Sequence, residues 1–225
     1  MAACRRSAQD HQAGCEVRVP VSVPETSQAI SVGLPEAVRW LHPFLAVSDP
    51  SPGGALTVEG WVQDPTMREV IAEFNRGHYT MLYVTGGPLE RGAMLTGYHT
   101  TAELGEASLL RMGMPKDLVQ VVFTPPVPRD RTYASAIALK RWLDAHHMVL
   151  SNLTVVAPGP HARRTRLLFQ KAFGDATHIG ALAAKDLDYD PQEWWMSSNG
   201  FRTEIDEAIA YLYAQLLFDP ELESN

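Results

Sequence analysis

Short apolar runs alternate along most of the chain with stretches in which apolar residues recur every three or four positions. Runs of four or five apolar residues are typical of buried strands, whereas spacings of three and four are typical of one face of a helix. The runs predict five strands, at residues 55–58, 81–84, 119–123, 153–156 and 179–182. The patterns between them predict helices at residues 65–76, 100–112, 132–146 and 161–173.

This alternation indicates the fold class. Strands joined in sequence by helices require right-handed crossovers and a mostly parallel sheet. The sequence therefore predicts an α/β protein with a three-layer Rossmann-like fold, in which a mostly parallel sheet of about five strands is flanked by helices. Helix starts are marked by Asp64-Pro65 and by the capping-box spacing of Thr100 and Glu103. A last helix is expected at residues 205–216, where an apolar stripe is wide enough to dock on the sheet.

The first part of the chain follows a different pattern. Residues 1–30 are polar and show no sustained periodicity. Residues 35–47 contain a short helical pattern, which ends before the turn-forming residues 49–54. We therefore predict an N-terminal extension over residues 1–52, partly disordered or forming a short packing helix, and a Rossmann-like domain over residues 53–225.

Composition and charge narrow the range of partners. The 225-residue chain has a formal net charge of −7, which gives no basic field to bind DNA or RNA. It has two cysteines, no apolar signal segment and no apolar run of about 18 residues, so we expect a cytoplasmic protein without a membrane span. No metal site is predicted, because a Cys/His/Asp metal spacing is absent. The GxSxG, GxGxxG and Walker patterns are absent as well. The oligomeric state stays open.

Functional residues are expected in the loops that follow the strands, because these loops all leave a parallel sheet at its carboxyl edge. Glu59 and Gly60 follow the first predicted strand, and Glu59 is interpreted either as a catalytic or ligand-binding carboxylate or as a solvated one. Thr85, Gly86 and Gly87 follow the second strand. Their backbone N–H groups either cradle an anion or form an ordinary tight turn.

The segment from residue 86 to residue 99 is long for a compact domain and carries Glu90 and Arg91. Such loops tend to be lids or binding loops, so this segment is a candidate lid. Glu103 follows it, at the start of the next predicted helix. We interpret Glu103 either as a cap alone or as an additional catalytic carboxylate of the same edge.

The third loop leads into the helix predicted at residues 132–146. It brings Arg131, Thr132 and Tyr133 to the functional edge as candidate ligand-binding residues. Arg131 is the candidate for binding an anion. The alternative is an ordinary ion pair between an arginine of this loop and Asp130.

The fourth loop carries the clearest chemical signal. His161 is followed by Arg163, Arg164 and Arg166 within the first turn of a predicted helix, where the macrodipole disfavours cations. This crowding predicts a compensating anion, such as a phosphate or carboxylate bound by Arg164 at the helix terminus. The dipole also favours neutral His161, which suits an acid/base catalyst near pH 7. Alternatively, the arginines are solvated and His161 is a cap.

The fifth region spans residues 193–204 and could fold over the same edge. Trp195 is a candidate stacking residue and Glu204 a candidate ligand-binding residue. Tryptophans of this kind more often anchor a loop to the core, and that alternative remains open for Trp195.

Taken together, these motifs resemble the YdcF, SanA and ElyC family of α/β proteins. The resemblance covers roughly residues 53–217 and implies a Rossmann-like sheet with a ligand cleft at its carboxyl edge. Ligands proposed for the family are nucleotide-like, and they include S-adenosylmethionine as a possible cofactor. The motifs that carry the resemblance are Glu59-Gly60-Trp61, Thr85-Gly86-Gly87, residues 101–105, residues 130–136, His161 with Arg164, Trp194-Trp195 and Arg202-Thr203-Glu204.

Two functions follow from these residues. The first is a small-molecule enzyme, a transferase or hydrolase, that acts on a phosphorylated or nucleotide-like ligand. In it Gly86, Gly87, Arg131 and Arg164 bind the anion and His161 is the acid/base. The second is a binding module that holds S-adenosylmethionine or a similar metabolite without turnover.

Overall fold

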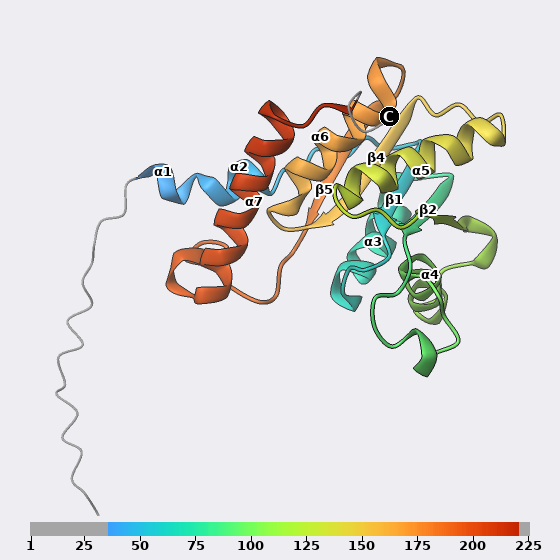
Figure 1. The fold of residues 1–225 in the computed structure, drawn as a ribbon, viewed down its shortest axis with the longest axis horizontal. Coiled ribbons are helices and arrows are strands. Elements are labelled where there is room, and N and C mark those ends of the chain that lie inside the picture. The colour runs from blue at the N-terminus through green and yellow to red at the C-terminus, as the bar shows by residue number, and fades with distance from the viewer. Residues whose placement is uncertain (1–35, 221–225) are drawn as a thin grey trace, which may run out of the picture. The chain divides into compact units, whose positions relative to one another are not determined.

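The computed structural model describes residues 36–220, and a five-stranded sheet is their central element (Figure 1). β1 spans Ala55–Glu59, β2 Met81–Gly86, β3 Val119–Phe123, β4 Asn152–Pro158 and β5 His178–Ala184. The strands lie in the order β3-β2-β1-β4-β5, and each neighbouring pair is parallel. The predicted α/β class and the Rossmann-like arrangement are confirmed.

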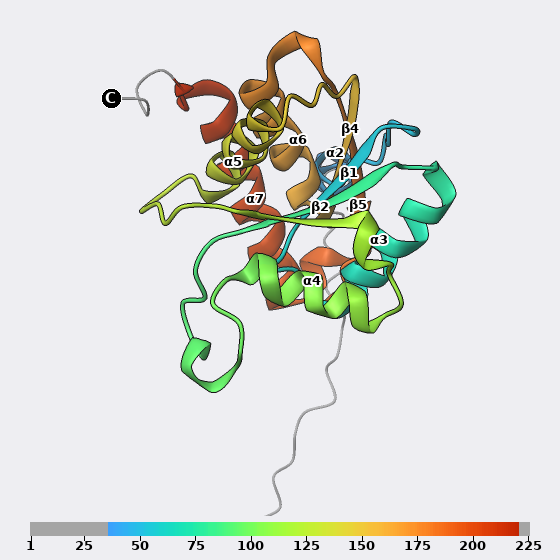
Figure 2. The same cartoon turned by 90° about the vertical axis from the view of Figure 1, so that its right-hand side faces the viewer.

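Helices cover both faces of the sheet (Figure 2). α3 (Asp64–Gly77) and α4 (Thr101–Arg111) pack on one face, and α5 (Arg131–Ala145) and α6 (His161–Phe173) pack on the other. Successive side chains of a strand point to opposite faces, so Leu56 and Val58 join the core under α3 and α4, and Ala55 joins the core under α5 and α6. Every residue of β1 is buried, which explains why this strand begins as a mainly apolar run.

The last helix differs from its prediction. α7 spans Ser198–Leu216 and begins earlier than expected, because the Ser197 side chain caps it by accepting a hydrogen bond from the Gly200 N–H, 3.0 Å away. The expectation that its apolar stripe docks on the sheet is wrong. Ile209 and Leu216 of that stripe are 62% and 72% exposed. α7 packs on α6 instead, where its small residue Ala214 meets Leu168.

The segment before β1 is packed on the domain. It contains α1 (Glu36–Arg39) and α2 (Leu41–Leu45). Asp49 then forms an antiparallel bridge with Ala181 of β5, and the Ser51 N–H donates to Thr154 Oγ1 at 2.8 Å. The part of the predicted extension before residue 36 lies outside the described residues. Short 3-10 helices occur at Ala93–Leu95 (η1), Lys116–Leu118 (η2), Gly174–Ala176 (η3) and Trp194–Met196 (η4).

The sheet order creates a switch point between β1 and β4. The chain proceeds outward from β1 to β2 and β3, and then returns to place β4 on the other side of β1. In sheets of this kind, ligands bind beyond the carboxyl ends of the two strands where the direction reverses. Glu59 ends β1 and His161 begins the helix after β4, so the topology brings both residues to this point.

Gly60 is required by the packing of α4 against the end of β1. A Cβ at this position would lie 2.2 Å from the Thr101 carbonyl oxygen. We expect Gly60→Ala to lower the free energy of unfolding by roughly 1–3 kcal/mol, because the start of α4 must move away. Urea denaturation monitored by circular dichroism measures the change.

Gly97→Ala is the matched control, because a Cβ at Gly97 meets no heavy atom within 4 Å. We expect its unfolding free energy to change by less than about 1 kcal/mol. If both alanine variants lose the same stability, or if Gly60→Ala loses none, close packing is not what selects glycine at position 60.

Candidate functional site

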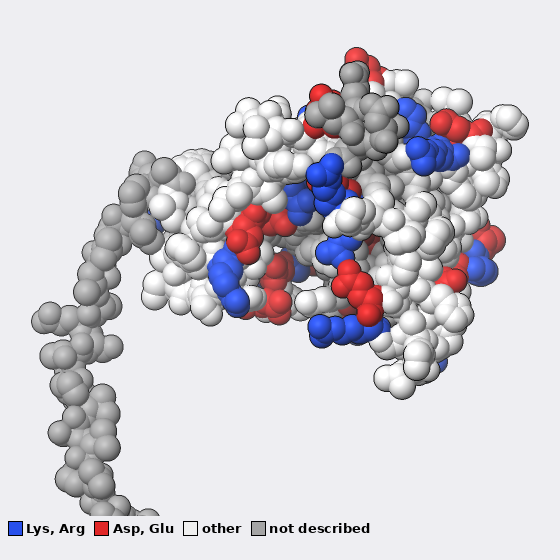
Figure 3. Space-filling view, in the orientation of Figure 1, with Lys and Arg blue, Asp and Glu red and all other residues white. Residues whose placement is uncertain are grey.

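A cleft of about 980 Å³ opens at the carboxyl edge of the sheet. It is lined by residues that follow all five strands and by α7. Figure 3 shows acidic and basic side chains gathered around a hollow on this face. Its volume lies at the upper end of the range for small-molecule sites, so the cleft is large enough for a ligand bigger than a phosphate.

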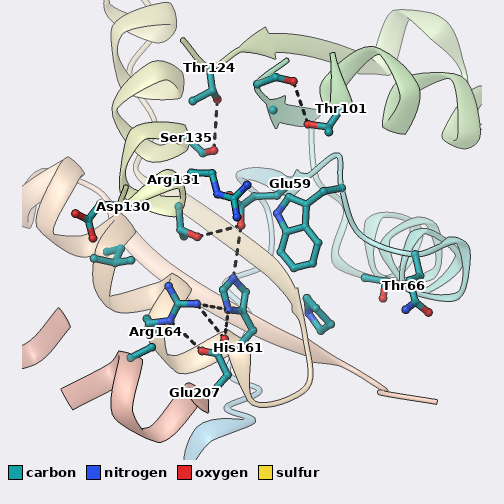
Figure 4. Close-up of a pocket in the computed structure, with 18 of the residues that line it drawn as sticks. Glu59, Thr66, Thr101, Thr124, Asp130, Arg131, Ser135, His161, Arg164 and Glu207 are labelled. Carbon is teal, nitrogen blue, oxygen red and sulfur yellow. Dashed lines mark hydrogen bonds and ion pairs between the residues drawn. The ribbon is translucent and has the colours of Figure 1, made fainter. Parts of the chain in front are cut away.

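Four charged residues form one connected row in the wall of the cleft (Figure 4). His161 Nδ1 lies 3.0 Å from Glu207 Oε1. Arg164 donates to both oxygens of Glu207, at 2.9 Å through Nε and 3.0 Å through Nη2. On the other side of the imidazole, His161 Nε2 lies 3.6 Å from Glu59 Oε2, which is an ion-pair contact rather than a hydrogen bond. We call Glu59, His161, Glu207 and Arg164 the charged row.

Each member of the charged row is positioned by a different part of the fold. Glu59 is fixed at the end of β1 and accepts a hydrogen bond from Thr132 Oγ1 at 3.3 Å. His161 and Arg164 lie one turn apart on α6, so both face Glu207 of α7. The side chains of His161 and Glu59 are only 9% and 8% exposed. A buried row of this kind depends on the mutual pairing of its charges.

The charges of the row shift one another's pKa. Burial alone would lower the pKa of His161, but the hydrogen bond to Glu207 and the nearby Glu59 outweigh it and raise that pKa. Burial alone would raise the pKa of Glu59, but the charge of His161 outweighs it and lowers that pKa, with smaller contributions from Ser135 and Trp61. The pKa of Glu207 is lowered to about 2, because hydrogen bonds to His161 and Arg164 outweigh burial. The row therefore favours an imidazolium between two carboxylates.

This result reverses the expectation for the protonation of His161. The helix dipole favours the neutral ring, yet two carboxylates within 3.6 Å favour the charged ring, and the pKa of His161 is raised. One proton of the imidazolium is directed toward Glu207. Among the described residues, Nε2 has no hydrogen-bond partner, although it is buried. This nitrogen is the donor that the charged row leaves available on the side of Glu59.

The chain itself supplies partners for all three arginines of α6, and two of these partners are carboxylates. Arg164 binds Glu207, and Arg166 Nη1 lies 3.5 Å from Asp49 Oδ2. Arg163 donates to the Phe44 carbonyl oxygen and stacks on the Phe44 ring at 4.0 Å. The arginine cluster therefore needs no bound anion to compensate it. Arg164 in particular holds its carboxylate with both arms of its guanidinium, rather than extending them into the cleft.

Several other predicted residues line the same cleft as the charged row. Arg131 lies at the start of α5 and forms a 2.6 Å ion pair with Glu90 of the candidate lid. Both side chains are largely exposed, at 74% and 78%, so this pair is weak and readily exchanged for a ligand. The predicted site residues that line the cleft are Glu59, Gly86, Gly87, Arg131, Thr132, His161 and Arg164.

The remaining predicted residues are occupied by structural contacts. Glu103 forms the capping box of α4, in which its carboxylate accepts from the N–H groups of His99 and Thr100 at 2.7 and 3.0 Å. We therefore propose no catalytic role for Glu103. Glu204 is fully buried and accepts from the Tyr189 hydroxyl at 2.8 Å, while also contacting His42.

Four more predicted residues fall outside the cleft lining for reasons of packing. Thr85 is buried within β2, directly beside Glu59 in the sheet register. Tyr133 packs its ring on Phe218, and the ring of Trp195 lies under the Arg39 guanidinium. Gly60 packs against α4, as described above.

Glu207 and Trp61 are the site residues to which the sequence assigned no role. Glu207 lies 46 positions from its partner His161, so no local motif joins them. The excess of arginines on α6 was the one sequence signal for Glu207, because it predicted a nearby anion. That anion is a carboxylate of the chain itself. Trp61 belongs to a motif of the first loop, and its ring lies 5.6 Å from the His161 ring in an edge-to-face contact.

Within residues 36–220, no group of three or more His, Cys, Asp or Glu side chains is placed to hold a metal ion. In the same range, every helix is too short or too polar to cross a membrane.

Comparison with known proteins gives no family assignment. No family model and no curated protein matches the chain. Among solved structures, the chain is similar to the reductase domain of an aureusimine biosynthetic cluster, with a TM-score of 0.24 and 10% sequence identity. The match covers 56% of this chain and 41% of that one. Similarity at this level carries no argument about function, which therefore rests on the geometry of the cleft.

Proposed function

We propose that the protein is an enzyme that transfers a phosphoryl or related group of a phosphorylated or nucleotide-like ligand, with His161 as its general acid. The observation that carries this proposal is the position of His161 in the wall of the cleft, buried between Glu59 and Glu207. Groups in a cleft whose pKa is shifted by burial and by charged neighbours are typical of active sites. The raised pKa of His161 suits it to donate a proton at neutral pH.

The proton balance of the reaction is supplied by Glu59 and His161. Nε2–H of the imidazolium donates its proton to the leaving oxygen as the bond from that oxygen to the transferred group breaks. The attacking hydroxyl or water is oriented by Glu59, and the proton it loses passes to the Glu59–His161 pair. The pair thus ends the cycle with the proton it began with. Glu207 and Arg164 are positioning residues, because they orient the imidazole and stabilise its charge.

The anionic part of the ligand is best supported at the start of α5. Thr66, Thr101, Arg131 and His161 all line the cleft, so α3, α4, α5 and α6 each begin there. The N-terminal end of a helix carries a partial positive charge, which favours an anion. Arg131 adds a guanidinium whose present partner is an exposed glutamate. Arg131 replaces Arg164 as the proposed anion ligand, since Arg164 is bound to Glu207.

The test is calorimetric titration of the protein with phosphate, nucleoside monophosphates and sugar phosphates, repeated on Arg131→Ala. We expect one class to bind selectively and Arg131→Ala to weaken it by roughly 10- to 100-fold, the effect of losing a charged hydrogen bond. Arg141→Ala is the matched control, because Arg141 is an exposed arginine farther along α5 and outside the cleft lining. If no phosphorylated ligand binds, or if both variants weaken binding equally, the proposed anion site is overturned.

The acidic residues of the cleft favour a second candidate, a binding module for S-adenosylmethionine or a similar metabolite. Carboxylates outnumber arginine and lysine side chains in the lining, where Glu59, Asp186 and Asp188 are joined by Glu90, Asp130 and Glu207. An acidic lining suits the positive sulfonium of this metabolite. The same titration separates the candidates, because the binding module takes up S-adenosylmethionine without consuming any ligand.

The resemblance to the YdcF, SanA and ElyC family supports this proposal. Several residues of the motifs that carry the resemblance line the cleft, among them Gly86, Gly87, Arg131 and Arg164. The low cysteine content supports a cytoplasmic location for the proposed enzyme.

A further inference from the structure

We infer that Trp61 is the stacking platform for a planar ring of the nucleobase type, so that the ligand of the cleft is nucleotide-like rather than only phosphorylated. The inference rests on the proposed function to the extent that both use the same cleft. It does not depend on which of the two candidate functions is performed, because a nucleotide-like substrate and S-adenosylmethionine both contain such a ring.

The exposure of Trp61 is the first observation. Its side chain is 51% exposed and lines the cleft, whereas Trp194 is only 2% exposed and belongs to the core. An exposed aromatic residue inside a cleft leaves a large apolar surface in water, and covering that surface with a flat ring is favourable. Stacking on a tryptophan is also tolerant of which base is bound.

The orientation of Trp61 is the second observation. Its ring makes an edge-to-face contact with the His161 ring, with centroids 5.6 Å apart and planes at 75°. Glu59 lies two residues before Trp61, and the indole contributes to the lowered pKa of that carboxylate, after burial and His161. An indole held by two buried residues loses little conformational freedom when a ligand stacks on it.

The third observation is the order of groups across the cleft. Trp61 contacts His161, while Thr132 at the start of α5 contacts Glu59. The indole and the start of α5, where the proposed anion site at Arg131 lies, therefore each contact a member of the proposed reacting pair. Gln63 lines the cleft on the side of Trp61, and its amide makes no capping bond to α3, so it is available to the polar edge of a ring. This order matches a ligand with a ring at one end and an anionic group at the other.

The experiment titrates the protein with adenosine, adenosine 5′-monophosphate and ribose 5-phosphate by calorimetry. We expect the wild type to bind both adenosine-containing ligands at least about 10-fold more tightly than ribose 5-phosphate, within the range that base stacking supplies. Trp61→Leu is expected to reduce this preference by roughly 5- to 100-fold without changing the affinity for ribose 5-phosphate. Trp61→Phe is expected to retain most of the preference, because a phenyl ring still stacks.

Trp40→Leu is the matched control, since Trp40 is 69% exposed and lies outside the cleft lining. Equal affinity of the wild type for all three ligands overturns the inference, as does an unchanged preference in Trp61→Leu. If adenosine binds but its phosphate adds no affinity, the ring site stands and the proposed phosphate class fails. If only ribose 5-phosphate binds, the proposed phosphate class stands and the ring site fails. If none of the three ligands binds, the ring site is overturned.

Discussion

Replacing His161 with glutamine is expected to lower kcat by roughly 10²- to 10⁴-fold, the usual contribution of a general acid or base. Glutamine preserves hydrogen-bonding groups near Glu207 but has no proton to give to a leaving oxygen. Ligand affinity is expected to stay within about threefold, because the proposed binding contacts lie at Arg131 and Trp61. Steady-state kinetics and calorimetry, using the ligand that the titrations select, measure the two effects separately.

The pH profile gives this prediction a second readout. The pKa of His161 is raised, so the wild-type rate should persist above the ordinary titration range of histidine and fall as the pH rises through that raised pKa. His178→Gln is the control, because His178 is an exposed residue that starts β5 at the opposite edge of the sheet. Equal losses of kcat and affinity in His161→Gln would falsify the general-acid role, and so would a loss of neither.

The fold could be predicted from the sequence because its signals are local. A parallel strand is marked in the sequence by a short, mainly apolar run, and β3 was predicted at its observed bounds although it is only partly buried. The capping box of α4 was also correct, since Thr100 and Glu103 satisfy each other within one turn. The N-terminal end of α7 was not predicted. The apolar periodicity begins only at residue 205, whereas Ser197 caps the helix further toward the N-terminus.

The site was predicted only in part, because its electrostatics depend on distant pairs. The arginines of α6 indicated a missing anion, but the sequence does not reveal that Glu207 of α7 supplies it. The helix dipole was the only influence on His161 that the sequence revealed, whereas two carboxylates from β1 and α7 raise its pKa against the effect of burial. The surroundings of His161 and Arg164 are set by tertiary packing, which a local sequence pattern does not reveal. The exposure of the apolar stripe of α7 has the same origin.

Neutralising Glu207 is expected to cost the fold more than any surface change. In Glu207→Gln, Arg164 and His161 lose the carboxylate that they share. Two cationic groups then remain side by side, because Arg164 Nη2 lies only 2.9 Å from His161 Nδ1. Breaking a fully buried pair costs about 3–5 kcal/mol; Glu207 is 17% exposed, so we expect a loss of roughly 2–4 kcal/mol of unfolding free energy near pH 5.5. Asp206→Asn, an exposed neighbour on α7, should change it by less than about 0.5 kcal/mol.

The pH dependence of this loss identifies its cause. The stability due to the lowered pKa of Glu207 is fully present above its unfolded value of 4.5 and disappears as the pH falls through about 2. The stability due to the raised pKa of His161 is fully present below its unfolded value of 6.5 and disappears as the pH rises through the folded value. The difference between wild type and Glu207→Gln should therefore be greatest between these two unfolded values and smaller at pH 3 and at pH 9.

Urea denaturation at pH 3, 5.5 and 9 measures this profile, and Arg164→Gln combined with Glu207→Gln completes the comparison. The double variant should be more stable than Glu207→Gln alone, because it also removes the guanidinium left beside the imidazolium. A loss that is the same at every pH, and that the second substitution does not relieve, would mean that Glu207 acts through its shape. The charged row would then be a packing feature of the cleft wall, and its role in tuning His161 would have no basis.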